Sequence, residues 1–90
     1  MGGEPLCEEN AFLTCLVIGE VKRRVPNIKI YIWSGYTYEE LIARGNPHIR
    51  DSLRLADVLI DGPYIAAERD ITLEMRGSRN QRIIDLSEKI

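Results

Sequence analysis

The segment Gly2-Gly3-Glu4-Pro5 has the composition of a ligand-binding turn. Glycines let backbone groups approach a bound molecule closely, because they carry no side chain. The carboxylate of Glu4 could hold a positively charged ammonium group. The same tetrapeptide is also common in ordinary surface turns, so it predicts a site only in combination with other residues.

Two further polar side chains follow predicted strands. Ser34 follows the apolar, aromatic and β-branched run 28–33, and Asp61 follows the run 57–60. The carboxyl ends of parallel strands form the edge at which α/β folds bind ligands. Ser34 and Asp61 are therefore candidate binding residues. A glycine exit from a buried strand and an Asp-Gly turn explain them equally well without function.

Residues 76–81, Arg-Gly-Ser-Arg-Asn-Gln, carry the densest set of hydrogen-bonding side chains in the sequence. Arg76, Asn80 and Gln81 could dock a protein partner or an anion. They could instead brace the chain by satisfying loose backbone groups. The bracing interpretation is slightly favoured.

The sequence offers no metal-binding or catalytic set. Cys7 and Cys15 have seven residues between them, which fits neither a zinc pair nor a redox Cys-x-x-Cys motif. Two thiolates are also too few for a four-iron cluster in its usual sites. No acid–base pair can be assembled around His48, the single histidine. We therefore predict no metal ligand and no catalytic residue in this sequence.

Length and charge restrict the class of protein. Ninety residues predict one domain, 1–90. A net charge of −2 with no clustered basic surface argues against nucleic-acid binding. No apolar run reaches the roughly 20 residues of a membrane span, so we expect no membrane partner. Two cysteines favour reduced thiols and a cytoplasmic location.

The expected elements are three helices and three strands. Residues 10–25 have helical periodicity, with one apolar face made by Leu13, Leu16, Val17 and Val21. Thr37 and Glu40 form a capping box that opens a short helix. Asn46-Pro47 starts the next helix, whose inward residues are Ile49, Leu53 and Ala56.

Strands are expected near 28–33, 57–60 and 82–86. Residues 64–81 lack a clear period and are expected to form a loop with at most a helical turn or short strand. The order of elements predicts an α/β fold with a mostly parallel sheet of about three strands and flanking helices.

Taken together, four segments carry a family resemblance. They are Gly2-Gly3-Glu4-Pro5, residues 34–41 (SGYTYEEL), residues 56–63 (ADVLIDGP) and residues 76–85 (RGSRNQRIID). In this order they resemble the activating proteins of anaerobic ribonucleoside-triphosphate reductase, which belong to the radical S-adenosylmethionine superfamily. The match runs from Gly2 to about Leu86 and corresponds to the later half or so of a family member.

The resemblance implies a fold, a reaction and a set of residues. In the family, a Cys-x₃-Cys-x₂-Cys triplet binds a four-iron four-sulfur cluster, and a radical made from S-adenosylmethionine abstracts hydrogen from a glycine of the reductase. By resemblance, Gly2, Gly3, Glu4 and Pro5 would bind this cofactor. Ser34 and Asp61 would be weaker candidates. The fold would be the later portion of a partial β/α barrel.

The sequence departs from the family at the cluster. The cysteine triplet does not occur in the 90 residues. We therefore expect a family fragment or truncated gene product that is inactive alone and binds neither the cluster nor S-adenosylmethionine tightly. A homodimer could cover the sheet edge and apolar face that such a fragment exposes. The alternative is a non-catalytic α/β module that docks a protein partner or a nucleoside ligand.

Overall fold

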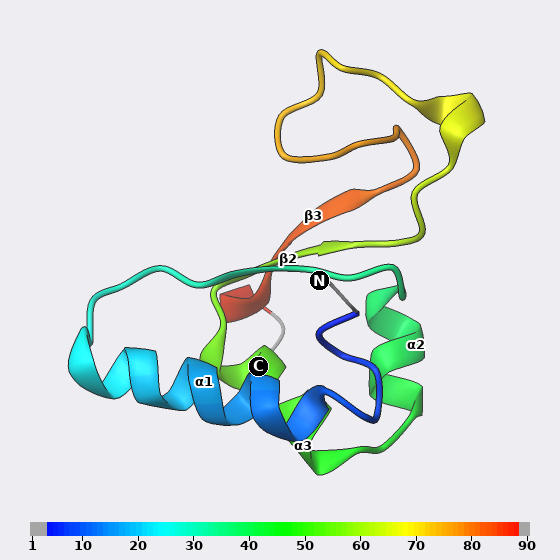
Figure 1. The fold of residues 1–90 in the computed structure, drawn as a ribbon. Helices are drawn as coiled ribbons and strands as arrows, with labels where there is room; N and C mark the ends of the chain where they lie inside the picture. Colours follow the sequence, from blue (N-terminus) through cyan, green and yellow to red (C-terminus); the bar gives the residue numbers. More distant parts are fainter. Residues whose placement is uncertain (1–3, 89–90) are drawn as a thin grey trace.

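The computed structural model describes residues 4–88, which form three α-helices, three strands and two short 3₁₀ turns (Figure 1). In chain order the elements are α1 (Ala11–Arg24), β1 (Tyr31–Trp33), α2 (Tyr38–Ala43), α3 (Pro47–Leu55), β2 (Val58–Asp61), a 3₁₀ turn (Ala66–Glu68), β3 (Arg82–Asp85) and a second 3₁₀ turn (Leu86–Glu88). Each predicted helix and strand is present, with shorter bounds for the first strand. Within residues 4–88, no helix has the length and hydrophobicity needed to cross a membrane.

The three strands form one mixed sheet in the order β1-β2-β3. Strand β1 is parallel to β2, with Tyr31 opposite Val58, whereas β3 is antiparallel to β2, with Asp85 opposite Val58. The α/β class is confirmed, but the expected mostly parallel sheet is wrong. A parallel return requires a crossover of a dozen or more residues, usually a helix. After β2 the chain instead forms the loop 62–81, which extends beyond the sheet and leads straight back into β3 (Figure 1).

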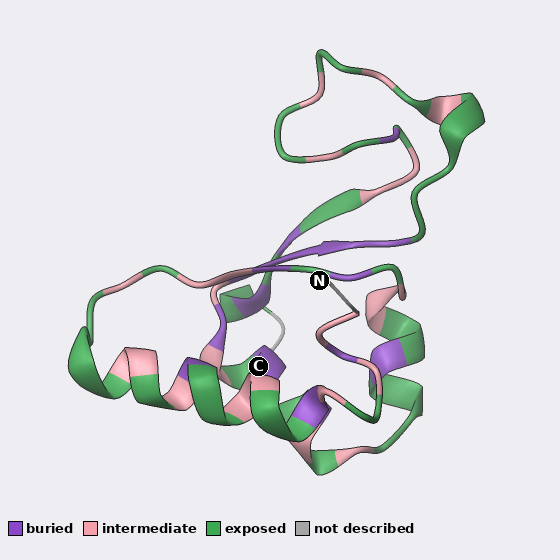
Figure 2. Ribbon diagram, viewed as in Figure 1, coloured by how far each residue is buried: buried purple, intermediate pink, exposed green. Residues whose placement is uncertain are grey.

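The helices lie on the same side of the sheet, and the core fills the space between them (Figures 1 and 2). Ile32, Leu59 and Ile84 occupy one row across the three strands and point their buried side chains into this core. The buried apolar cluster consists of Leu6, Ala11, Ile18, Ile32, Leu41, Ile49, Leu53, Ala56, Leu59, Ile84 and Leu86. The described strands thus form an open sheet covered by one helical layer, and the partial barrel stays a prediction.

Local capping signals fix the helix boundaries as predicted. Thr37 Oγ1 accepts a hydrogen bond from Glu40 N at 3.1 Å, and Glu40 Oε1 accepts one from Thr37 N at 2.8 Å. Asn46 Oδ1 accepts from His48 N at 2.8 Å at the start of α3. Gly45, just past α2, has a φ of +66°, which costs glycine little. The predicted inward side chains of α3 are buried.

The packed side of α1 differs from the predicted one. Of the predicted face, Leu13, Leu16 and Val17 are 62%, 53% and 53% exposed, and Val21 is half-buried. The buried residues of the helix are instead Ala11 and Ile18. The helix packs against α3. Apolar residues occur on more than one side of α1, so periodicity alone could not decide which side faces the core. The sequence-based prediction that Leu13, Leu16 and Val17 face the core is therefore wrong.

Candidate functional site

The carboxylate of Glu4 lies against the carboxyl end of β1. Its Oε2 accepts hydrogen bonds from Ser34 Oγ at 2.7 Å and from Leu6 N at 3.1 Å. Its Oε1 accepts one from Gly35 N at 2.6 Å. Ser34 is 4% exposed, whereas Gly35 is exposed, so the carboxylate sits at the boundary between the core and solvent. The structure thus brings together two of the predicted site residues, Glu4 and Ser34.

The local sequence at the end of β1 explains this arrangement. Ser34 N donates to Ile60 O at 2.9 Å, which extends the parallel ladder by one residue beyond β1. Ser34 Oγ in turn accepts from Tyr36 N at 3.1 Å, which turns the chain toward α2. A Cβ at position 35 would lie 3.4 Å from Glu4 Oε1, so the glycine allows the close approach of the carboxylate.

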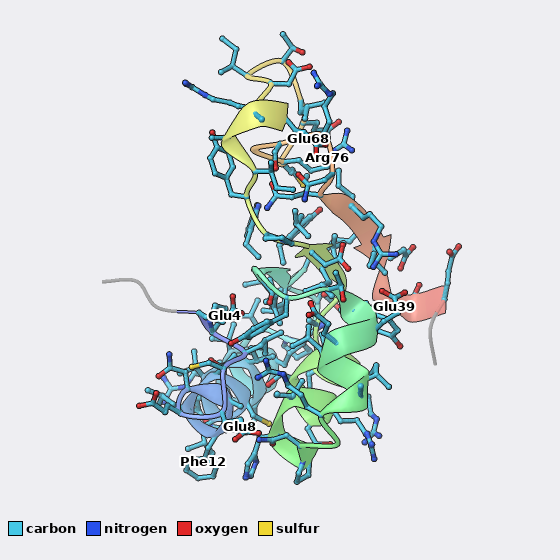
Figure 3. The ribbon with its side chains drawn as sticks, turned by 90° about the vertical axis from the view of Figure 1, so that its right-hand side faces the viewer. Glu4, Glu8, Phe12, Glu39, Glu68 and Arg76 are labelled. Atoms are coloured by element: carbon cyan, nitrogen blue, oxygen red, sulfur yellow. The ribbon has the colours of Figure 1, made fainter. Side chains whose placement is uncertain are left out.

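The segment after Glu4 is fixed to the start of α1. Asn10 Nδ2 donates to Glu4 O at 3.0 Å, and Thr14 Oγ1 donates to Pro5 O at 2.7 Å. The predicted site residues Gly2 and Gly3 lie outside the described residues. Of the predicted tetrapeptide, the structure therefore describes Glu4 and Pro5. Glu4 is labelled in Figure 3.

This geometry gives the Glu4 carboxylate a fixed orientation and leaves it acceptor capacity. A carboxylate offers about four lone-pair positions. Within residues 4–88, Oε1 accepts one hydrogen bond, from Gly35 N. An ammonium group could therefore bind Oε1 without displacing Ser34 or Leu6. The residues that are described fit the ammonium end of an amino-acid-like ligand.

Asp61 is the last residue of β2 and lies at the same edge of the sheet, but its carboxylate binds other groups of the chain. It is 1% exposed and forms an ion pair with Arg82, whose Nε donates to Oδ1 at 3.0 Å. Oδ2 accepts from Tyr38 N at 2.7 Å, at the start of α2. The hydrogen bonds to Asp61 and Glu39 raise the pKa of Arg82 above its ordinary value. Asp61 thus joins β2, β3 and α2, and its role in ligand binding stays a prediction.

The hexapeptide 76–81 is bound to its own loop. Gln81 Oε1 accepts from Gly77 N at 2.8 Å, and Gln81 Nε2 donates to Gly62 O at 2.9 Å. Asn80 Nδ2 donates to Pro63 O at 2.7 Å. Arg76 Nη1 donates to Gln81 O at 3.1 Å. These contacts agree with the bracing interpretation.

Sequence reasoning missed two residues of these networks. Ser78 is fully buried, accepts from Ile65 N at 3.2 Å and donates to Asn80 Oδ1 at 2.6 Å. Arg82 neutralises the buried Asp61. Neither could be singled out by type alone, since surface Ser and Arg residues are common and most of the partners are distant in sequence.

The described residues do not fit an iron–sulfur cluster. Cys7 and Cys15 are partly buried free thiols. No group of three or more His, Cys, Asp or Glu side chains placed to hold a metal occurs in the described part of the chain. Residues 4–88 therefore contain no set of side chains that could hold an iron–sulfur cluster.

A separate groove of about 330 Å³ lies at the amino end of β2, away from Glu4. Its lining residues are Lys29, Asp57, Val58, Ile83, Asp85 and Ser87. The pKa of Asp57 is lowered, first by the hydrogen bond from Ile30 N and then by Lys22. The two carboxylates of this groove each accept a hydrogen bond from the chain: Asp57 from Ile30 N, and Asp85 from Ser87 Oγ. They therefore stabilise the local structure.

The chain is thus a small α/β domain in which the oriented carboxylate of Glu4 lies beside the carboxyl ends of the parallel strands β1 and β2. The model of the 4Fe-4S single cluster domain family matches residues 1–84. The chain belongs to this family.

Individual proteins similar to this chain share one name. The chain is similar to the anaerobic ribonucleoside-triphosphate reductase-activating proteins of Haemophilus influenzae, with 39% identity over 82 residues, and Vibrio cholerae, with 37% over 82 residues. The corresponding protein of Escherichia coli K12 is 31% identical over 80 residues. These matches cover 91%, 91% and 89% of this chain and 50%, 50% and 49% of the relatives. The chain therefore spans about half the length of the curated relatives it matches. No solved structure matches.

Proposed function

We propose that this chain forms the part of an anaerobic ribonucleoside-triphosphate reductase-activating protein that holds the amino-acid end of S-adenosylmethionine. The oriented Glu4 carboxylate is the observation that carries this proposal. The names of the relatives support it. The cluster ligands of such a protein would lie outside these 90 residues, since the two cysteines present do not suffice.

In this proposal each residue of the edge has a distinct task. Glu4 receives the ammonium group of the cofactor, while Ser34 and Gly35 fix the orientation of its carboxylate. Gly2 and Gly3 would allow the cofactor to approach the backbone, because they carry no side chain. Pro5 is included in the proposed binding segment by resemblance to the family. When bound beside a reduced cluster, S-adenosylmethionine would supply the radical that activates the reductase, which is the proposed protein partner.

A second candidate function is non-catalytic docking of the reductase by the loop 62–81. The loop is braced internally, yet Ile71 is 84% exposed and Tyr64 is 53% exposed. A rigid loop that presents apolar side chains is suited to protein binding. Binding of purified reductase to the immobilised chain, compared with an Ile71→Glu variant, tests this candidate. An unchanged affinity in the variant would exclude Ile71 from the contact.

The isolated chain should bind S-adenosylmethionine only weakly. Ordering a glycine-rich segment costs roughly 1–2 kcal/mol of backbone entropy per residue fixed. One partly exposed carboxylate–ammonium contact contributes about 1 kcal/mol or less. The balance predicts a dissociation constant in the millimolar range or weaker.

Amide chemical shifts measured by NMR during a titration test the proposed role of Glu4. We expect S-adenosylmethionine to shift the amides of Gly35 and Leu6, which donate to the Glu4 carboxylate. Glu4→Gln, which keeps the shape but removes the charge, should abolish these shifts. Methylthioadenosine, which lacks the ammonium group, should not produce them. No shift at Gly35 at roughly 10 mM cofactor, or equal shifts in Glu4→Gln, would contradict the proposal.

A separate measurement tests the proposal that the cluster ligands lie outside these 90 residues. Anaerobic reconstitution of the chain with iron and sulfide should leave no stable visible chromophore and no stoichiometric iron. About four irons per chain would show that these residues hold a cluster after all.

A further inference from the structure

The loop 62–81 is joined to the rest of the chain at three places. Its two ends continue β2 and β3, which are adjacent strands about 4.8 Å apart. The third place is Met75, whose carbonyl oxygen accepts a 2.7 Å hydrogen bond from Trp33 Nε1. Within residues 4–88, this is the one hydrogen bond between residues 63–80 and the part of the chain before β2. Figure 1 shows the loop extending beyond the sheet, so its orientation depends on few contacts.

The loop is braced internally, so its contacts with the sheet decide its orientation as a unit. Arg69 and Ser78 form an antiparallel bridge. Arg79 N donates to Glu68 O at 2.9 Å. Ser78 Oγ accepts from Ile65 N at 3.2 Å. A braced loop held only at two adjacent strand ends can turn about the line through those ends, and a third contact away from that line is needed to fix its orientation.

Trp33 is placed to make this third contact. Ile32 points into the core, so Trp33, the next residue of β1, projects from the face of the sheet that the helices do not cover. The Trp33 ring is half exposed and stacks against Tyr31, two residues earlier on the same face, with the ring centroids 6.3 Å apart. The indole N–H therefore meets Met75 outside the plane of the sheet and away from the line through the two loop ends.

The backbone of Met75 takes an unfavourable conformation at this contact. Its φ is +63°, and it is the one described residue other than glycine with a positive φ. Such left-handed backbone is unfavourable for a residue with a side chain, and it persists where surrounding contacts over-determine it. The hydrogen bond from Trp33 is a contact of this kind, because it fixes the direction of the Met75 carbonyl group.

We propose that Trp33 is a positioning residue that fixes the loop 62–81 in one orientation relative to the carboxyl end of β1. The next two residues of the chain, Ser34 and Gly35, bind the Glu4 carboxylate. Three consecutive residues therefore connect the loop on one side with the candidate site on the other.

The fixed orientation has a consequence for a partner protein that binds the loop. Ile71 is 84% exposed and is available for such a contact. Because Trp33 holds the loop, a partner docked on Ile71 lies at a defined place relative to a ligand on Glu4. This consequence rests on the proposed function, in which the loop docks the reductase, whereas the orientation of the loop does not depend on it.

NMR of the 90-residue chain tests the orientation. Trp33 is the single tryptophan, so its indole N–H gives one resonance. We expect this proton to exchange with solvent about tenfold more slowly than a free indole, although the ring is half exposed. Residual dipolar couplings of the loop and of the helices should fit one alignment tensor. Trp33→Phe, which keeps a ring but removes the donor, should reduce the loop couplings to about half while those of the helices stay unchanged.

Two further variants separate this role from general destabilisation. Tyr31→Phe keeps the stacked ring and changes only a hydroxyl group, so the loop couplings should stay as in the wild-type chain. Met75→Gly should slow indole exchange by a further factor of about five, because glycine adopts a positive φ readily. Full-size loop couplings in Trp33→Phe would overturn the proposal, as would a wild-type indole proton that exchanges like a free one or faster exchange in Met75→Gly.

Binding of purified reductase to the immobilised chain tests the consequence for docking. Trp33→Phe should weaken binding about tenfold, because a loop without a fixed orientation must be ordered when the partner docks. Ile71→Glu separates the two ideas. If Ile71→Glu weakens binding and Trp33→Phe does not, the loop docks the reductase but Trp33 does not position it for docking. If neither variant weakens binding, docking by the loop is wrong, and the dipolar couplings alone decide whether Trp33 fixes the loop.

Discussion

Ser34 Oγ donates a 2.7 Å hydrogen bond to Glu4 Oε2 across 30 positions of the sequence. This bond joins the segment before α1 to the carboxyl end of β1. Gly35 N donates to the other oxygen of the same carboxylate, Oε1, at 2.6 Å. Two consecutive residues of one turn therefore bind the two oxygens of Glu4. The orientation of the Glu4 carboxylate is therefore fixed by groups of the chain itself.

Removal of the guanidinium that neutralises Asp61 should destabilise the fold. Arg82→Met leaves a carboxylate that is 1% exposed without its cation. Removing one partner of a buried pair costs about 3–5 kcal/mol, and we expect somewhat less, about 2–3 kcal/mol, because Arg82 itself is half exposed. The free energy of unfolding from urea titration measures the loss.

Arg54→Met is the matched control for this substitution. Arg54 pairs with Asp51 on α3, and both side chains are exposed, at 60% and 49%. An exposed pair of this kind contributes about 0.5 kcal/mol or less. Equal losses in the two variants would show that the Asp61–Arg82 pair has no special structural role.

Replacement by alanine should change the stability of the chain in opposite directions at two glycines. Gly62, directly after β2, has a φ of +100°, so Gly62→Ala is strained and should cost about 1–3 kcal/mol. Gly19 lies inside α1, and a Cβ added there would meet no atom of another element within 4 Å, so Gly19→Ala should stabilise the chain by about 0.5–1 kcal/mol. Thermal unfolding of both variants checks the pair. A stabilised Gly62→Ala variant would be inconsistent with the backbone described.

Local signals make most element boundaries predictable from the sequence. The capping box of Thr37 and Glu40 and the Asn46-Pro47 start depend only on neighbouring residues. The direction of β3 is not predictable in the same way, because it depends on how the loop 62–81 returns. The packed side of α1 depends on α3, and periodicity alone therefore places Leu16 on the wrong side.

The candidate site is predictable by residue type but not by partner. Glu4 and Ser34 both stand out in the sequence by their positions near a turn and a strand end, and they are in contact. Asp61 stands out by the same reasoning, yet its carboxylate binds Arg82. Only the fold reveals that pairing, since 21 positions separate the two residues.

Loss of the Gln81 side chain should loosen the loop 62–81. Gln81 accepts from two backbone amides, Gly77 N and Ser78 N, and donates to Gly62 O. Gln81→Ala removes all three hydrogen bonds, so amide exchange in the loop should accelerate about tenfold while exchange in the helices stays unchanged. Arg79→Ala, at an exposed position of the same loop, is the control and should have little effect. Unaltered exchange in Gln81→Ala would indicate that the hexapeptide does not brace the loop.

Stability should fall in acid partly through Asp57. Its carboxylate accepts a hydrogen bond from Ile30 N at 2.7 Å and pairs with Lys22 at 3.2 Å, and these contacts lower its pKa below the ordinary value of 3.8. A carboxylate whose pKa is lowered by folding contributes stability that is fully present above its unfolded pKa and is lost as pH falls through the folded pKa. Asp57→Asn keeps an acceptor for Ile30 N but loses the charge, so it should cost about 1 kcal/mol at pH 7 and progressively less below about pH 4. Urea unfolding of both chains between about pH 7 and about pH 2.5 measures the difference. A difference that stays constant across this range would show that the charge of Asp57 does not stabilise the fold.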